Sequence, residues 1–141
     1  MKTYFVYAYK FSDGGIYIGR SNENSNRFGN IECYKNQYVY SKMKEDPDFE
    51  CIKVYGDNNI FVIYQLEAAL IRHFKDKLGS KCYNGDDGNG WYQAALRDLS
   101  NDREGHKMSD LVEWINEFKS VVAMAIVMSI NFLEGRSIDL I

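Results

Sequence analysis

The chain has 141 residues and a formal net charge of −3, and it is 45% hydrophobic and 26% charged, which is typical of one soluble globular domain. Its three cysteines show no CxxC spacing, which argues against a disulfide framework or a zinc site and indicates reduced thiols in a cytoplasmic protein. The tyrosines and Lys10 interrupt any signal-peptide core, and no apolar run reaches the roughly 18 residues of a membrane span.

The first 22 residues predict a β-hairpin followed by a polar loop. Residues 4–11 are rich in strand-forming side chains, Ser12–Gly15 has turn composition, and Ile16–Gly19 reads as the returning strand. Gly19 near the strand end suggests a kink or a close backbone approach. We expect a loop from Ser21 to Asn26 and a helix that begins near Ser25 or Asn26 and carries Arg27.

The middle of the chain predicts a helix, a third strand and a long amphipathic helix. The first helix covers about 37–44 and ends before Asp46–Pro47, because the residue before proline disfavours helical geometry. Residues 49–55 alternate as a strand. Residues 59–78 carry apolar side chains at three-to-four spacing and end before Gly79, which favours a helix with that glycine as its stop signal.

The last third predicts a glycine-rich turn region over Tyr83–Gly90, a short helix over 91–99 and a long helix over Ser109–Leu133. The segment Val121–Met128 is apolar on all sides, so we expect it to be buried, either across the sheet or in a homo-oligomer. Charge is uneven along the chain. Residues 1–45 and 67–84 are net basic, and residues 85–141 are net acidic, so an acidic total weakens but does not exclude a phosphate-binding face.

Glu67 is the sharpest anomaly, because its spacing from Ile63, Leu70 and Ile71 places a carboxylate at the edge of the apolar stripe. A buried carboxylate is costly unless it is paired or binds a metal. The alternative is a solvated glutamate, or one paired with Lys75, Arg72 or Arg27.

Three more side chains have both an ordinary and a chemical interpretation. Arg27 near a helix start gains nothing from the helix dipole and suits bidentate phosphate recognition, but it can equally be an exposed loop residue. Tyr7 and Tyr17 on neighbouring strands can form a cross-strand aromatic pair. A phenol near a metal or a guanidinium can instead lose its proton and act as a general base.

Taken together, these elements resemble the GIY-YIG endonuclease family over roughly residues 3–90. Tyr17-Ile18-Gly19 keeps the second half of the motif, and Phe5-Val6-Tyr7 stands where Gly-Ile-Tyr is usual. Arg27 falls at the place of the family's helix arginine, and Glu67 with the following AALIRHF resembles its metal-binding helix. Asn84 in CYNGDDGNG resembles the asparagine that closes the module. Ile31 stands where many members carry a polar residue, and Lys35 or Tyr34 are candidates to replace it.

The resemblance implies an α+β module over residues 1–90, a three-stranded antiparallel sheet flanked by helices, with a helical extension over 91–141. It implies hydrolysis of DNA phosphodiester bonds with one Mg²⁺ or Mn²⁺ held by Glu67. Arg27 would neutralise the transition state, Tyr7 would accept the proton of the attacking water, and Tyr17 would assist. We further expect substrate contacts from four residues: Arg20, Ser21, Lys35 and Asn84.

Two other functions stay open. The chain can be a weakly active or inactive descendant that binds nucleic acid or a protein partner on the same fold. It can also be a structural module that assembles through the Ser109–Leu133 helix. Small members of the family without a separate DNA-reading domain suggest a phage, mobile-element or restriction context.

Overall fold

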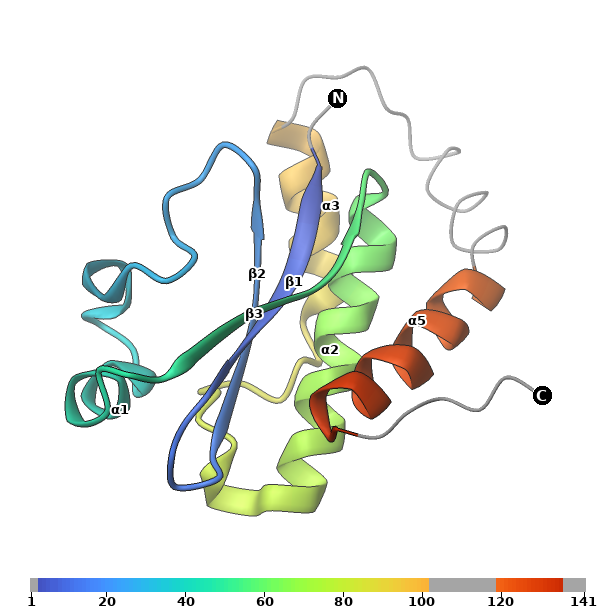
Figure 1. Cartoon of the computed structure of the whole chain (residues 1–141). Coiled ribbons are helices and arrows are strands. Elements are labelled where there is room, and N and C mark those ends of the chain that lie inside the picture. Colours follow the sequence, from blue (N-terminus) through green and yellow to red (C-terminus); the bar gives the residue numbers. More distant parts are fainter. Residues whose placement is uncertain (1–2, 102–118, 136–141) are drawn as a thin grey trace.

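The computed structural model describes residues 3–101 and 119–135 and has an α+β architecture (Figure 1). Three strands form one antiparallel sheet: β1 (Tyr4–Lys10), β2 (Ile16–Asn22) and β3 (Glu50–Asp57), in the order β2-β1-β3. The expectation of a three-stranded antiparallel sheet with flanking helices is confirmed. β1 is the central strand, and β2 is an edge strand along which the candidate site lies.

The hairpin forms as predicted, but β2 is longer than expected. The turn is closed by the Phe11 N–H to the Gly15 carbonyl at 3.0 Å and the Gly14 N–H to the Phe11 carbonyl at 3.0 Å. The prediction of a loop that begins at Ser21 is wrong, because β2 pairs with β1 as far as Asn22. Pairing places Tyr9 opposite Tyr17 and Tyr7 opposite Gly19, and it puts Arg20 on a rigid strand.

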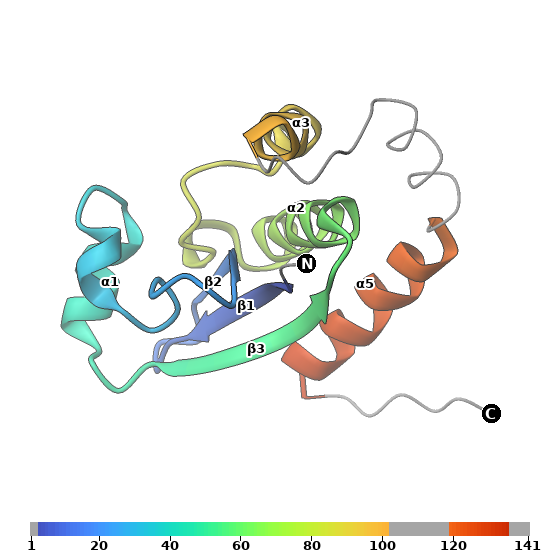
Figure 2. The same cartoon turned by 90° about the horizontal axis from the view of Figure 1, so that it is seen from above.

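One face of the sheet is covered by α2 (Ile60–Leu78), the predicted long helix. The Asn59 side chain caps its start by accepting from the N–H groups of Phe61 and Val62, and Gly79, with φ of 59°, ends it as predicted. Figure 2 shows α2 between the sheet and α3 (Trp91–Asn101). Val6, Ala8 and Ile18 point from the strands into this core, as the two-residue period of a strand requires.

The opposite face of the sheet carries an aromatic core. Its buried members are Phe5, Tyr7, Tyr9, Phe11, Tyr17, Tyr34, Val39, Met43 and Tyr83. A short 3-10 helix, η1 (Ile31–Tyr34), and α1 (Val39–Glu45) contribute three of them. β1 is therefore buried on both faces, which places the hydroxyl groups of its tyrosines inside the protein.

The prediction of a helix that begins near Ser25 or Asn26 is wrong, because Arg27 lies in a loop before η1. Side chains in this loop bond the nearby backbone: Asn22 accepts from the Asn24 N–H at 2.9 Å and Ser25 accepts from the Arg27 N–H at 3.2 Å. Asn and Ser side chains compete with helical hydrogen bonds in this way. The local polar sequence therefore stabilises turns instead of a helix.

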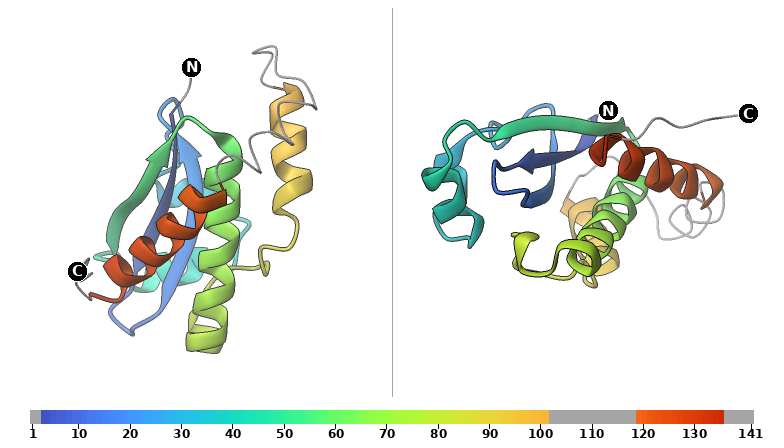
Figure 3. Two further views of the ribbon diagram at one scale, coloured as in Figure 1. Left: turned by 90° about the vertical axis from the view of Figure 1, so that its right-hand side faces the viewer. Right: turned by 60° about the horizontal axis from the view of Figure 1, so that its bottom comes forward.

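The described part of the last helix, α5, spans Lys119–Leu133 and packs on α2 and β3 (Figure 3). The first part of the predicted helix, residues 109–118, lies outside the described residues. Val121–Met128 is not buried on all sides within the chain: Val122 and Ala125 are buried, but Met124 is 54% exposed and Val127 is 52% exposed. α5 therefore packs through one face within the chain.

Contacts at the end of α5 fix it to the rest of the chain. Lys10 Nζ donates to the Leu133 carbonyl at 2.9 Å, and Lys77 pairs with Glu134, which is a favourable place for cations at a helix C-terminus. Cys33, Cys51 and Cys82 are all free thiols. Within residues 3–101 and 119–135, no helix has the length and apolar character that crossing a membrane requires.

Candidate active site

A cavity of about 830 Å³ lies beside β2 and gathers most of the residues predicted for the site. Its walls come from β1, β2, the loop before η1, α2 and the Tyr83–Asp86 segment. Seven expected residues line it: Tyr7, Tyr17, Arg20, Ser21, Arg27, Glu67 and Asn84. Lys35 does not line it; its ammonium is exposed and pairs with Glu32 at 2.7 Å.

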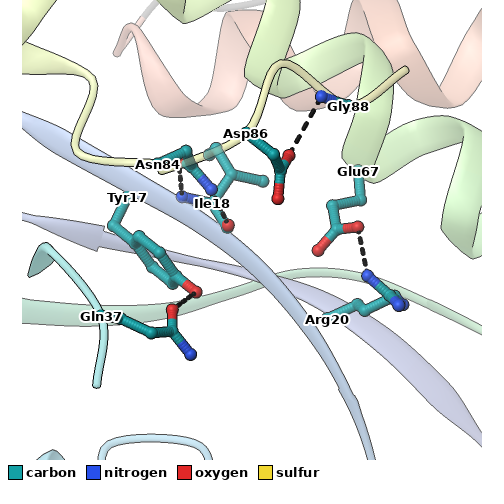
Figure 4. A network of polar contacts seen from close by, with 8 residues as sticks. All are labelled: Tyr17, Ile18, Arg20, Gln37, Glu67, Asn84, Asp86 and Gly88. Atoms are coloured by element: carbon teal, nitrogen blue, oxygen red, sulfur yellow. Dashed lines mark hydrogen bonds and ion pairs between the residues drawn. The ribbon is translucent and has the colours of Figure 1, made fainter. Parts of the chain in front are cut away.

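Glu67 projects from α2 and forms an ion pair with Arg20 of β2 (Figure 4). Arg20 Nη1 lies 2.6 Å from Glu67 Oε1, and the Glu67 side chain is only 12% exposed. The Arg20 guanidinium also stacks 3.8 Å above the Tyr64 ring. Burial raises the pKa of the Glu67 carboxyl, while Arg20 opposes the rise, so the pair partly compensates the cost of an ionised buried carboxylate.

The partner of Glu67 differs from the residues that the sequence suggested. Among the described residues, Glu67 forms its ion pair with Arg20 and not with Lys75, Arg72 or Arg27. The strand was expected to end at Gly19, so Arg20 was not placed opposite α2. The length of β2 decides this contact.

Asn84 fastens the segment after α2 to β2. Its Oδ1 accepts from the Ile18 N–H at 3.0 Å, and its Nδ2 donates to the Ile18 carbonyl at 2.7 Å. The side chain is buried, so both bonds replace ladder hydrogen bonds that an edge strand lacks. This geometry braces β2 and holds the cavity wall between Tyr17 and Gly19.

The phenols of Tyr7, Tyr9 and Tyr34 form a buried chain of hydroxyl groups. Tyr34 Oη lies 2.5 Å from Tyr7 Oη and 2.6 Å from Tyr9 Oη. The Gly29 N–H donates to Tyr9 Oη at 2.7 Å. Tyr17 points elsewhere in the cavity and donates to Gln37 Oε1 at 3.1 Å.

Arg27 lies against these phenols from the loop side. Its guanidinium carbon is 4.5 Å from the centre of the Tyr34 ring, and it interacts electrostatically with Tyr7 and Tyr17. Burial works against the charge of Arg27, but Tyr7 and Tyr17 outweigh it and raise the pKa of the guanidinium. Arg27 is thus a fixed cation beside both tyrosines of the predicted site.

Burial controls the acidity of the two tyrosines. It raises the pKa of Tyr7 to about 12, although hydrogen bonding from Tyr34 and the charge of Arg27 act in the opposite direction. Burial also raises the pKa of Tyr17, and Arg27 again opposes the rise. The sequence-based expectation that a nearby guanidinium eases proton loss has the right sign, but burial is the larger effect.

The donors in the cavity fit a hard divalent ion held mainly by water and substrate. No group of three or more His, Cys, Asp or Glu side chains able to hold a metal occurs among the described residues. The lining does contain two carboxylates, Glu67 and Asp86, which Figure 4 shows on the same side of β2. One or two carboxylates completed by waters and phosphate oxygens are a common set of ligands for Mg²⁺.

Several polar lining residues were not predicted from the sequence, among them Asp86 and Gln37. Asp86 was assigned to a glycine-rich turn, and Gln37 to the start of a helix, yet both border the cavity. The DDG composition signalled only a turn, and Asp86 indeed accepts from the Gly88 N–H at 3.0 Å. The place of Asp86 depends on how the Tyr83–Asp86 segment folds back over β2, and Gln37 lies in the turn between η1 and α1.

Comparison of the chain with models of protein families, with curated proteins and with solved structures finds no match.

Proposed function

We propose that the chain is a GIY-YIG-type endonuclease that hydrolyses DNA phosphodiester bonds with one divalent metal ion. The observation that carries the proposal is the convergence of Tyr7, Tyr17, Arg27 and Glu67 on one cavity, from four separate elements of the chain. A carboxylate, a fixed cation and two phenols are the groups that such a reaction requires. The assignment of the fold to the GIY-YIG family is part of the same proposal.

Each side chain has a definite part in the proposed reaction. Glu67 would hold Mg²⁺ or Mn²⁺, and the bound ion would supply Lewis-acid stabilisation of charge on the phosphate. Arg27 would stabilise the negative charge that develops in the transition state. Tyr7 would accept the proton of the attacking water, and Tyr17 would hydrogen-bond water or phosphate.

The remaining lining residues bind and support. Arg20 and Ser21 follow the motif on β2, border the cavity and are half-buried, so they are suited to contact a phosphate. Asn84 supports the wall behind Tyr17 through its two bonds to Ile18. Lys35 would contribute only at longer range, because it lies outside the lining.

The test is nicking of supercoiled plasmid with Mg²⁺ or Mn²⁺ and with chelator. We expect metal-dependent nicking by the parent chain and a loss of about 100-fold or more in Glu67→Ala and in Arg27→Ala. Matched controls are Glu32→Ala and Lys44→Ala, which remove an exposed carboxylate and an exposed cation outside the cavity. Nicking that survives Glu67→Ala, or that falls equally in the controls, contradicts the assignment.

A second function, a nucleic-acid-binding module without cleavage, is favoured by the Arg20–Glu67 ion pair. The pair engages the carboxylate that the nuclease would use for metal. Under this alternative, folded parent protein retains DNA in a mobility-shift assay without cutting it. Binding would then be unchanged by Glu67→Gln.

We also propose that the chain forms a homo-oligomer through α5. The observation behind this is the outward face of that helix, which exposes Val121, Met124, Val127, Met128 and Phe132. Neighbouring exposed apolar side chains often mark an interaction site. Light scattering that gives a monomer at working concentration contradicts this part and leaves the nuclease proposal intact.

A further inference from the structure

Tyr34 occupies the centre of the buried hydroxyl chain. It ends η1, its side chain is fully buried, and its hydroxyl lies between those of Tyr7 and Tyr9. The Arg27 carbonyl is its third neighbour, at 3.3 Å. Each hydroxyl has only one proton to donate. The three phenols must therefore donate and accept in a definite order, and the Tyr34 hydroxyl takes part in that order.

The direction of the chain follows from its outer end. The Gly29 N–H can only donate, so Tyr9 Oη accepts there and has its own proton available for Tyr34. Tyr34 Oη then accepts from Tyr9 and has one proton to donate, for which the Arg27 carbonyl at 3.3 Å is one acceptor. Its other neighbour is Tyr7 at 2.5 Å, where either hydroxyl can be the donor while both are neutral.

Tyr7 lies at the inner end of the chain, with the Arg27 guanidinium beside it. Once Tyr7 has lost its proton its oxygen can only accept, so the Tyr34 hydroxyl at 2.5 Å is then its donor. Tyr17, by contrast, donates to Gln37 Oε1 and so acts as a donor in the same cavity. A donor directed at an oxygen stabilises its deprotonated form. The surroundings therefore favour loss of the proton from Tyr7 over loss of the proton from Tyr17.

We propose that Tyr34 is a positioning residue that donates a hydrogen bond to Tyr7 and thereby selects Tyr7 as the proton acceptor of the reaction. The inference rests on the proposed nuclease function. The groups that face Tyr34 are Tyr7 and Tyr9 from β1, Tyr17 from β2 and Arg27 from the loop. Burial raises the pKa of Tyr34 itself, and its contact with Tyr7 raises it further, so Tyr34 stays protonated while Tyr7 ionises.

The proton and bond changes balance as follows. The deprotonated oxygen of Tyr7 takes one proton from water as the water oxygen bonds to phosphorus. The bond between phosphorus and the leaving sugar oxygen breaks, and that oxygen takes a proton from solvent. Tyr7 then returns its proton to solvent, while Tyr34 keeps its own proton throughout.

The first test replaces Tyr34 by Phe, which keeps the ring and removes the hydroxyl. We expect about tenfold slower single-turnover nicking at a given pH, an unchanged affinity for DNA, and a pH–rate profile displaced upward by about one pH unit. The matched control is Tyr55→Phe. Among the described residues, the Tyr55 hydroxyl hydrogen-bonds Asp57 on the same strand, away from the hydroxyl chain. A rate loss without displacement of the profile indicates a merely structural role and overturns the inference.

A second variant works even where Tyr34→Phe fails to fold. Replacement of Tyr34 by 3-fluorotyrosine keeps the hydroxyl and makes it a stronger donor, so the profile should move to lower pH. A structural role predicts no movement in that direction. An upward or absent displacement overturns the inference.

A third measurement needs neither DNA nor metal. With 3-fluorotyrosine at position 7, the ¹⁹F shift reports the ionisation of that residue, and Tyr34→Phe should raise its apparent pKa by removing a donor. If it does so while the parent chain cuts no DNA, the nuclease function fails and the Tyr34–Tyr7 coupling stands. If the parent cuts DNA and the ¹⁹F titration is unchanged, the inference about Tyr34 fails alone.

Discussion

The ring of Tyr7 leaves no room for a side chain at Gly19 of the motif. The substitution Gly19→Ala tests this. An ideal Cβ at Gly19 would lie 2.3 Å from Tyr7 Cζ and 2.4 Å from Tyr7 Oη. Carbon atoms that are not bonded pack at about 3.5–4.0 Å. Tyr7 is fully buried and directly opposite Gly19 in the strand pairing, so its ring has little room to move away.

The expected cost combines three effects. Overpacking of a core costs about 1–3 kcal/mol, and displacement of the Tyr7 hydroxyl from Tyr34 costs about 1 kcal/mol more. The lower backbone entropy of alanine in the unfolded chain returns about 0.4–1 kcal/mol. The free energy of unfolding should therefore fall by about 1–3.5 kcal/mol, a large part of the roughly 7–20 kcal/mol expected for a chain of this length.

Urea unfolding followed by circular dichroism measures this difference. The matched control is Gly85→Ala, because a Cβ at Gly85 meets no atom within 4 Å, and we expect less than about 0.5 kcal/mol there. In a Tyr7→Leu background the clash is relieved, so Gly19→Ala should cost at least about 1 kcal/mol less, a coupling that a double-mutant cycle reveals. Equal costs at Gly19 and Gly85, or no coupling to Tyr7, refute the reasoning.

Three further predictions follow from the site and from α5. Asn84→Ala leaves the buried Ile18 N–H and carbonyl without their side-chain partners and should lower the free energy of unfolding by about 2–4 kcal/mol; a loss below 1 kcal/mol in urea contradicts the bracing role. Because burial raises the pKa of Tyr7 to about 12, its deprotonated fraction grows about tenfold per pH unit below that value, so single-turnover nicking should accelerate from pH 7 to pH 9, and a flat profile excludes Tyr7 as the base. Phe132 is 59% exposed on α5, so Phe132→Lys should leave the melting temperature unchanged while light scattering shows dissociation of any oligomer; an oligomer that persists places the interface elsewhere.

Those elements that rest on local signals were predicted well from the sequence. α2 begins after the capping side chain of Asn59 and ends at Gly79, close to the predicted bounds. The hairpin follows from turn composition between two strand-forming runs. Glu67 lies at the edge of the apolar stripe, as its spacing predicted, with its side chain 12% exposed, because helical periodicity alone determines which side chains border that face.

The expectations that failed depend on distant contacts or on competition within a loop. β2 extends to Asn22 because β1 is there to pair with it, and this extension supplies Arg20 as the partner of Glu67. The loop that carries Arg27 is held by side-chain bonds from Asn22 and Ser25. An apolar composition cannot tell whether α5 is buried on one face or on all, since that depends on what packs against it.

The tyrosines of the site could not be separated from core residues by sequence, because they are core residues. Tyr7 packs at 5.0 Å from the Tyr9 ring and 5.3 Å from the Phe28 ring, and the same burial raises its pKa. A sheet that buries a phenol fixes its position and at the same time lowers the fraction of it that is deprotonated near neutral pH. Arg27 and the Tyr34 hydroxyl offset part of that effect at the Tyr7 oxygen. The proposed chemistry therefore depends less on the tyrosine of the motif than on the cation and the donor that the loop before η1 and the end of η1 bring to it.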